Sequence, residues 1–233
     1  MRTEAVVSCE EHGIAATVWD LPIRVFHWAL ALLFAVAYLT GIRPGYYAVH
    51  KGAGYAILGL LVFRLIWGFI GPGPARFASF VRGPAAVLGH LKELLHRQHR
   101  PLPGHNPLGG WAVVAILALM AVQIMSGLFA ATFDYEGPLA RLLPDSGQDM
   151  MAGLHAFTVN LLLAMLAVHL VGIAVTSFLG RENLVASMFH GRKRLAVGDL
   201  VAVRLASRWR VVLAIALAAL AVVLVLALAR LAG

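Results

Sequence analysis

The stretch His155-Ala-Phe-Thr-Val-Asn-Leu-Leu-Leu-Ala-Met-Leu-Ala-Val-His169 is uncharged between its two terminal histidines. Fourteen residues of α-helix make nearly four full turns, so both imidazoles leave the same face, about 21 Å apart along the axis. The apolar run continues to about Phe178, which is long enough to cross a bilayer. Ionisable side chains on one face of a membrane helix indicate function. The spacing suits two stacked haem groups, although a single such histidine is often only a hydrogen-bonded core residue.

The composition indicates a membrane protein. Of 233 residues, 61% are hydrophobic and 13% are charged, which is too apolar for an ordinary soluble domain. The net charge of +8 could suggest nucleic acid, but the basic residues lie between apolar runs, where they determine membrane topology. We therefore expect lipid and not nucleic acid as a partner. The single cysteine, Cys9, provides neither an iron–sulfur cluster nor a covalent haem attachment, so any haem would be held by histidine or methionine.

Five apolar runs predict an all-α membrane protein, namely a four-helix transmembrane haem-binding bundle plus a fifth, C-terminal transmembrane helix. The bundle is expected within residues 21–180, and its spans at about residues 23–41, 52–70, 108–131 and 154–179. The fifth helix is expected within residues 211–233.

Shorter segments connect these spans. Residues 1–20 form a polar tail without a visible cleavable signal peptide, and Asp20 and Pro22 are typical helix-start residues. Residues 80–98 are typical of an amphipathic helix at the membrane interface. Residues 181–210 form a basic segment before the fifth span.

The basic residues predict the orientation in the membrane. Of the 19 lysines and arginines, only Arg43, Lys51, Arg141 and Arg230 fall on the side opposite the N-terminus. By the positive-inside rule, the N-terminus is cytoplasmic and the C-terminus, after five spans, is periplasmic.

Depth along the spans groups four histidines into two pairs. His50 opens the second span and His155 the fourth, both at the outer side. His27 lies 14 residues before the outer end of the first span, and His169 lies 14 residues beyond His155, so both are about 21 Å deeper. We therefore expect the pairs His50/His155 and His27/His169. Iron ligated by two histidines has no open site, which favours electron transfer over oxygen binding.

Three further residues could contribute to a haem site. Gly41 is on the face of His27 at the outer level, and Gly54 lies one turn beyond His50; both could leave room for a porphyrin, although glycine also serves ordinary close helix packing. Arg64 lies 14 residues past His50 and could pair with a haem propionate or a quinone oxygen, or could extend to the inner surface. His105, before the third span, is a rival ligand at a shallower depth than His27.

Several motifs resemble the bacterial cytochrome b561 family, which includes the b-type cytochrome subunit of nickel–iron hydrogenases. The likeness covers about residues 18–195. Besides the fourth span with its two histidines, it rests on Trp19-Asp20-Leu21-Pro22-Ile23-Arg24-Val25-Phe26-His27-Trp28, His50-Lys51-Gly52-Ala53-Gly54-Tyr55, Phe63-Arg64-Leu65-Ile66-Trp67-Gly68, Gly104-His105-Asn106-Pro107-Leu108-Gly109-Gly110, Arg181-Glu182-Asn183-Leu184-Val185 and Gly191-Arg192-Lys193.

The resemblance implies a four-helix protein of the bacterial inner membrane that binds haem b and links the quinone pool to a redox partner. The matching positions make His27, His50, His155 and His169 the expected axial ligands of two haem b groups. Quinone is the expected substrate, and a periplasmic hydrogenase or c-type cytochrome is the expected protein partner.

Two other functions are open at this point. Some relatives oxidise superoxide and reduce quinone, and Arg43 and Lys51 beside His50 would attract such an anion. Against this, the loop at residues 132–153 is acidic; it could steer a basic periplasmic cytochrome or be merely solvated. A haem-free transporter ranks last, because the sequence has neither inverted repeats nor broken helices.

Overall fold

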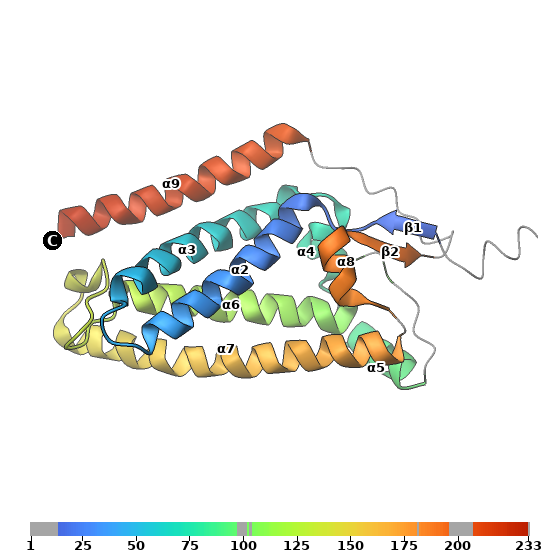
Figure 1. The fold of residues 1–233 in the computed structure, drawn as a ribbon, viewed down its shortest axis with the longest axis horizontal. Coiled ribbons are helices and arrows are strands. Elements are labelled where there is room, and N and C mark those ends of the chain that lie inside the picture. The colour runs from blue at the N-terminus through green and yellow to red at the C-terminus, as the bar shows by residue number, and fades with distance from the viewer. Residues whose placement is uncertain (1–13, 97–101, 103, 181, 196–206, 233) are drawn as a thin grey trace, which may run out of the picture. The chain divides into compact units, whose positions relative to one another are not determined.

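A computed structural model of the chain describes residues 14–96, 102, 104–180, 182–195 and 207–232. Within these residues, five helices are long and apolar enough to cross a membrane. They are α2 (Leu21–Gly41), α3 (Tyr47–Ile70), α6 (Pro107–Phe129), α7 (Asp145–Leu179) and α9 (Arg208–Ala232) (Figure 1). The predicted class, a multi-span helical membrane protein, is thus confirmed.

The main difference from the predicted spans is the start of the fourth. It is expected at about Leu154, whereas α7 begins at Asp145. Hydropathy does not mark the additional residues, because Asp145, Ser146, Gln148 and Asp149 are polar, but Asp145 in the first turn interacts favourably with the helix dipole. The span is therefore helical beyond its apolar run.

Short elements occupy the connections. The predicted amphipathic helix at residues 80–98 is divided into α4 (Phe77–Phe80) and α5 (Pro84–Leu95), with three non-helical residues between them. The remaining short helices are η1 (Gly73–Ala75), η2 (Ala140–Leu142) and α8 (Leu184–His190). Of the predicted tail, residues 1–13 lie outside the described residues, as do Arg181 and residues 196–206 of the basic segment.

A two-stranded sheet, which the sequence does not predict, joins the two ends of the four-span core. Strand β1 (Ile14–Thr17) pairs antiparallel with β2 (Arg192–Leu195), with Ile14 opposite Leu195 and Thr17 opposite Arg192. A chain returns to the same side of a membrane only after an even number of crossings. The sheet is therefore consistent with four crossings between residues 17 and 192.

The chain divides into two compact units. The first comprises Met1–Arg24, Trp67–Val113 and Ala167–Arg208, and the second comprises Val25–Ile66, Val114–Leu166 and Trp209–Gly233. Each of the long helices therefore contributes residues to both units.

In the first unit, Asp20 fixes the start of α2. Its Oδ1 accepts a hydrogen bond from the backbone N–H of Ile23 at 3.1 Å, which confirms the predicted helix start. Its Oδ2 accepts a second hydrogen bond, at 3.0 Å, from Nε1 of Trp67, whose side chain is fully buried. Asp20 is itself only 5% exposed, so its carboxylate is buried with both oxygens hydrogen-bonded.

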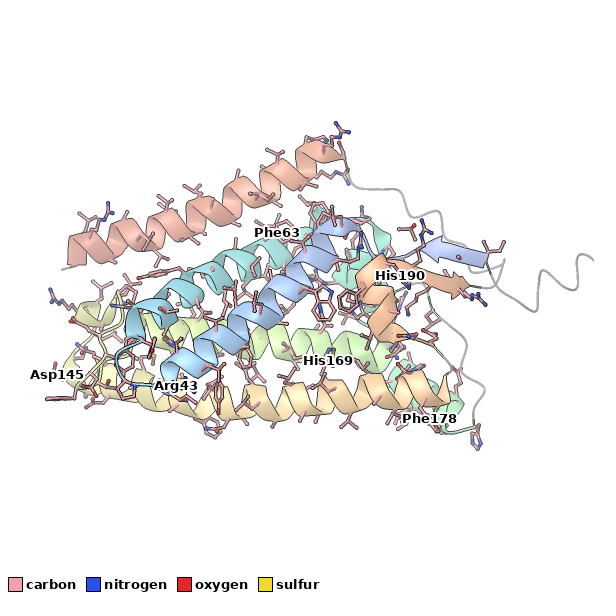
Figure 2. The ribbon with its side chains drawn as sticks, in the orientation of Figure 1. Arg43, Phe63, Asp145, His169, Phe178 and His190 are labelled. Carbon is pink, nitrogen blue, oxygen red and sulfur yellow. The ribbon has the colours of Figure 1, made fainter. Side chains whose placement is uncertain are left out.

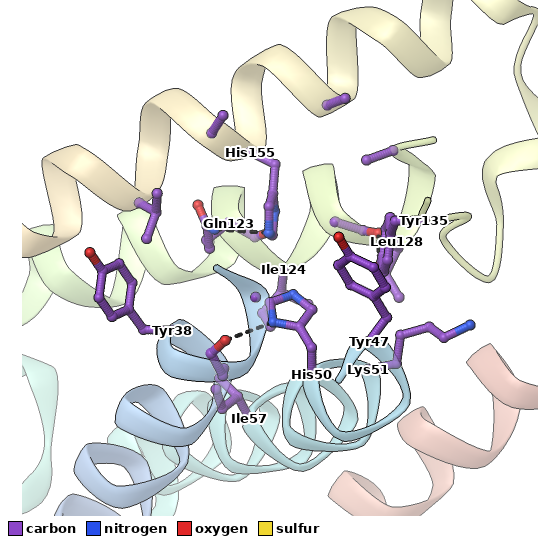
Figure 3. Close-up of a pocket in the computed structure, with 18 of the residues that line it drawn as sticks. Tyr38, Tyr47, His50, Lys51, Ile57, Gln123, Ile124, Leu128, Tyr135 and His155 are labelled. Carbon is purple, nitrogen blue, oxygen red and sulfur yellow. Dashed lines mark hydrogen bonds between the residues drawn. The ribbon is translucent and has the colours of Figure 1, made fainter. Parts of the chain in front are cut away.

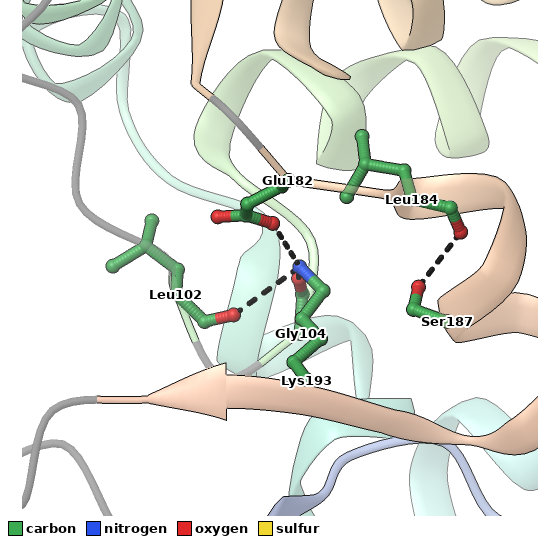
Figure 4. Close-up of polar contacts among 6 residues, drawn as sticks. All are labelled: Leu102, Gly104, Glu182, Leu184, Ser187 and Lys193. Carbon is green, nitrogen blue, oxygen red and sulfur yellow. Dashed lines mark hydrogen bonds and ion pairs between the residues drawn. The ribbon is translucent and has the colours of Figure 1, made fainter. Parts of the chain in front are cut away.

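Lys193 of β2 connects several segments of the first unit (Figure 4). Its Nζ lies 3.2 Å from Oε2 of Glu182 and donates to the carbonyl oxygens of Gly104 at 3.1 Å and Leu102 at 3.4 Å. The Lys193 and Glu182 side chains are 8% and 10% exposed. A buried ammonium requires such partners, because burying an unpaired charge is costly.

In the second unit, four helices share one apolar core. Ile57 of α3, Met120 of α6 and Leu162 of α7 are buried together, and Phe34 of α2 packs against them. Helix α9 lies close to α3 in the same unit, since a Cβ built on Gly59 would be 3.4 Å from a methyl carbon of Val222. Small residues at such contacts let membrane helices approach closely.

Candidate haem-binding site

A cavity of about 390 Å³ lies within the second unit (Figure 3). It is lined by residues of α2, α3, α6 and α7 and by the loop after α6, and we call it the histidine cavity. Four of the residues predicted to bind haem line it: Gly41, His50, Gly54 and His155. Its lining is mostly apolar with a few polar groups, as expected for a cofactor site.

The imidazoles of His50 and His155 face each other in this cavity. Their ring centroids are 6.0 Å apart, and their planes are inclined at 82°. The sequence places these two residues at the same depth on different spans, and the structure brings them together.

Backbone carbonyls orient both rings. Nδ1 of His50 lies 2.7 Å from the carbonyl oxygen of Ala37, and Nδ1 of His155 lies 2.9 Å from that of Gln123. A carbonyl can only accept, so both Nδ1 atoms carry the proton and both Nε2 atoms have a free lone pair. The Gln123 side chain agrees, because its Nε2 amide lies 3.1 Å from Nε2 of His155 as a donor to that lone pair.

This geometry fits a metal between the two rings. An imidazole nitrogen lies about 2 Å from a bound metal, as in zinc sites, and the ring centre lies about 1 Å beyond it, so two rings on opposite sides of one iron have centroids about 6 Å apart. Histidine ligands usually donate their other ring N–H to a carbonyl or carboxylate, as both rings do here. Among the described residues, no group of three or more His, Cys, Asp and Glu could hold an ion by itself. The two facing imidazoles are compatible with the predicted haem site, in which two histidines would provide the axial ligands.

Two glycines make room for the imidazoles. A Cβ built on Gly41 would lie 2.8 Å from Nδ1 of His50, and one built on Gly127 would lie 2.7 Å from Cε1 of His155. Gly41 therefore leaves space for the His50 ring, and its predicted role beside a porphyrin stays a prediction. Gly54 does border open space, since no heavy atom lies within 4 Å of a Cβ built on it.

The two histidines of the second predicted pair lie in different units, so the structure does not test this pair. His27 is a half-buried residue of α2 in the second unit, with its ring 5.0 Å from that of Trp28. His169 is a half-buried residue of α7 in the first unit (Figure 2). Because α7 is one continuous helix, His155 and His169 do share a helical face. The pairing of His27 with His169 stays a prediction.

The structure also shows the environment of two other residues that the sequence offers as candidates for a haem site. Arg64 is only 3% exposed, so it is buried and does not extend to the surface. The ring of His105 lies between those of Trp19 and Phe80, at centroid distances of 4.7 and 4.8 Å. His105 is thus a half-buried residue of the first unit among aromatic rings, and it does not line the histidine cavity.

Lys51 and Tyr135 also line the histidine cavity. Nζ of Lys51 is 6.0 Å from the centroid of the Tyr135 ring. Burial raises the pKa of Tyr135 to about 12, so its hydroxyl stays protonated at neutral pH. Arg43, in contrast, is exposed after the end of α2 (Figure 2).

Sequence reasoning missed Gln123, Gly127 and Tyr135. A signal existed for Gln123, because an amide in the middle of an apolar span is costly and usually functional. Gly127 and Tyr135 have no comparable signal, because their roles depend on which residues of other segments lie beside them.

Comparison with known proteins gives distant relatives. The chain is 24% identical to a protein named probable Ni/Fe-hydrogenase B-type cytochrome subunit from Rhizobium leguminosarum bv. viciae, over 83% of this chain and 97% of that one. Proteins of the same name match from Bradyrhizobium diazoefficiens, at 23% identity over 76% and 85%, and from Azotobacter chroococcum, at 24% over 76% and 88%. No solved structure matches the chain.

The family described as prokaryotic cytochrome b561 matches residues 18–191. This match includes all four predicted histidines and ends before α9. The resemblance seen in the motifs is thus confirmed over three quarters of the chain. The protein belongs to the prokaryotic cytochrome b561 family.

Proposed function

We propose that this protein is a diheme cytochrome b that carries electrons across the bacterial inner membrane between the quinone pool and a periplasmic redox partner. Membership of the family implies haem b and electron transfer. The main support for a specific site is the facing pair His50 and His155, in which each Nδ1 atom is hydrogen-bonded to a backbone carbonyl oxygen. In this proposal, these two residues ligate one haem and His27 and His169 ligate the other.

The residues of the chain would hold the cofactors and exclude water. A haem with two histidine ligands supplies one-electron transfer without an open coordination site. Ala37 and the backbone of Gln123 fix the ring tautomers of the cavity pair, so that each Nε2 is available as a ligand. Arg64, buried on the α3 helix, is a candidate partner for an anionic group such as a propionate or a quinone oxygen.

A hydrogenase is the partner that we favour, because three relatives carry the name Ni/Fe-hydrogenase B-type cytochrome subunit. A c-type cytochrome is the other candidate. Membranes that contain the protein and its partner distinguish them, since hydrogen gas would reduce the haem only through a hydrogenase.

Haem counting tests the proposal. We expect two haem b per chain by pyridine haemochrome, and one in each of the four variants His27→Ala, His50→Ala, His155→Ala and His169→Ala. The two variants of one pair should lose the same component of the reduced spectrum. His96→Ala, at an exposed residue outside the spans, is the control and should retain both haems. One haem or none in the unaltered protein would contradict the proposal.

Superoxide oxidation is a second candidate, because Lys51 lines the histidine cavity and its positive charge would attract an anion. The assay is reduction of the haem by superoxide in the purified protein, followed by reduction of added quinone. Lys51→Gln should slow haem reduction by superoxide and leave reduction by dithionite unchanged. Equal rates before and after this change would exclude a role for the positive charge.

A further inference from the structure

Tyr135 lies against the His50 ring and is hydrogen-bonded to the glycine that packs against the His155 ring. Its ring lies 6.1 Å from that of His50 in an edge-to-face arrangement at 85°. Its hydroxyl donates a hydrogen bond at 3.0 Å to the carbonyl of Gly127, the residue that packs against the His155 ring. One side chain thus contacts one imidazole directly and the other through a glycine.

The loop that carries Tyr135 is bound to the end of α6. The backbone N–H of Gly137 donates to the carbonyl of Ala130, and that of Leu139 to the carbonyl of Leu128, both at 2.8 Å. Thr132 and Tyr135 exchange two further backbone hydrogen bonds, at 2.7 and 3.4 Å. Carbonyls at a helix end need such donors. The loop is therefore held in place, and the Tyr135 ring has a defined position over the cavity.

A tight glycine contact restricts this loop further. A Cβ built on Gly137 would lie 2.6 Å from the carbonyl oxygens of both Gly127 and Leu128. The ring of Tyr47 lies 6.0 Å from that of Tyr135 on the α3 side. Tyr135 is thus packed between α3 and α6.

We propose that Tyr135 is a positioning residue for the haem of the histidine cavity: it fixes the plane of the His50 ring relative to that of His155 and shields the site from water. This inference rests on the proposed function, because it requires a haem between these two histidines. Residues that orient metal ligands and exclude solvent set the redox potential of the metal.

The test uses two spectroscopic properties that a merely structural role would not change. Ferric haem with two axial imidazoles gives an EPR signal whose anisotropy depends on the angle between the ring planes, which is 82° here. The midpoint potential responds to water, because the ferric state carries one more positive charge than the ferrous state and is stabilised by solvation.

Three variants of the full-length purified protein are compared. Tyr135→Leu removes the ring, and we expect a changed anisotropy and a lower midpoint potential of the cavity haem, with both haems retained. Tyr135→Phe keeps the ring and removes the donor to Gly127, so we expect a smaller shift in the same direction. Tyr46→Leu is the control at an exposed tyrosine, 53% accessible, and should leave both properties unchanged.

The outcomes separate this inference from the proposed function. If His50→Ala leaves the haem content unchanged, the proposed function fails before Tyr135 is considered. If both haems are present and neither Tyr135 variant changes the EPR signal or the potential, the positioning role is wrong. If Tyr135→Leu does not assemble, Tyr135→Phe decides: a shifted signal or potential supports the role, and unchanged values overturn it.

Discussion

Gly127 packs against His155 so closely that a Cβ on Gly127 would lie 2.7 Å from Cε1 and 3.0 Å from Nδ1 of the imidazole. The ring cannot move away freely, because its Nδ1 is bonded to the carbonyl of Gln123 at 2.9 Å. We therefore expect Gly127→Ala to displace the ring and to lower the content of the haem proposed for the histidine cavity in the purified protein. Gly153→Ala on α7, where a Cβ would meet nothing within 4 Å, is the matched control. We expect Gly153→Ala to retain the full haem content and, because alanine favours helix over glycine, to stabilise α7 by up to about 1 kcal/mol.

The Gln123 side chain contacts the same nitrogen of His155 that would bind iron. If Nε2 is the ligand atom, this amide contact cannot persist in the haem-loaded protein. Gln123→Leu should accordingly leave the haem content unchanged, since the backbone carbonyl that holds Nδ1 is retained. The measurement is the absorbance of the reduced haem per chain. Loss of one haem in Gln123→Leu would show instead that the amide is required for cofactor binding.

Asp20 caps α2 and accepts the indole N–H of buried Trp67. Asp20→Ala removes both interactions, and we expect it to cost about 1 kcal/mol for the cap and about 1–3 kcal/mol for the unsatisfied indole. The midpoint of thermal unfolding in detergent should fall. Asp134→Ala, at an exposed loop residue, should leave it unchanged. Asp20→Asn keeps an acceptor for the cap, so we expect its midpoint of thermal unfolding to lie between those of Asp20→Ala and Asp134→Ala.

Lys193 binds Glu182 and two carbonyl oxygens in a buried site. Removing one partner of a buried ion pair typically costs about 3–5 kcal/mol, so Lys193→Met should destabilise the protein strongly. The double variant Lys193→Met/Glu182→Gln also removes the buried carboxylate that would otherwise be unpaired, so stability should partly recover. Chemical unfolding in detergent measures both. An additive effect of the two substitutions would contradict an energetic coupling between these residues.

The parts of the site that follow from helix geometry could be predicted from the sequence. The depths of His50 and His155 on two apolar runs match, because rise and turn per residue are constant in a helix. The loop of residues 130–139 could not be predicted, because its position depends on hydrogen bonds to the carbonyls at the end of α6. The spacing likewise gives the face and depth of Gly41, but not that His50 of α3 lies against it.

The β1–β2 pairing has a consequence for biogenesis. Strand β1 precedes the first span, whereas β2 follows the fourth, so during synthesis β1 has no partner until residue 195 has left the ribosome. Strand β2 can pair with β1 only if the chain after the fourth span lies on the same side of the membrane as β1. A nascent chain with one span skipped would present β2 across the membrane from β1, so sheet formation would distinguish correctly inserted molecules from those with an odd number of crossings.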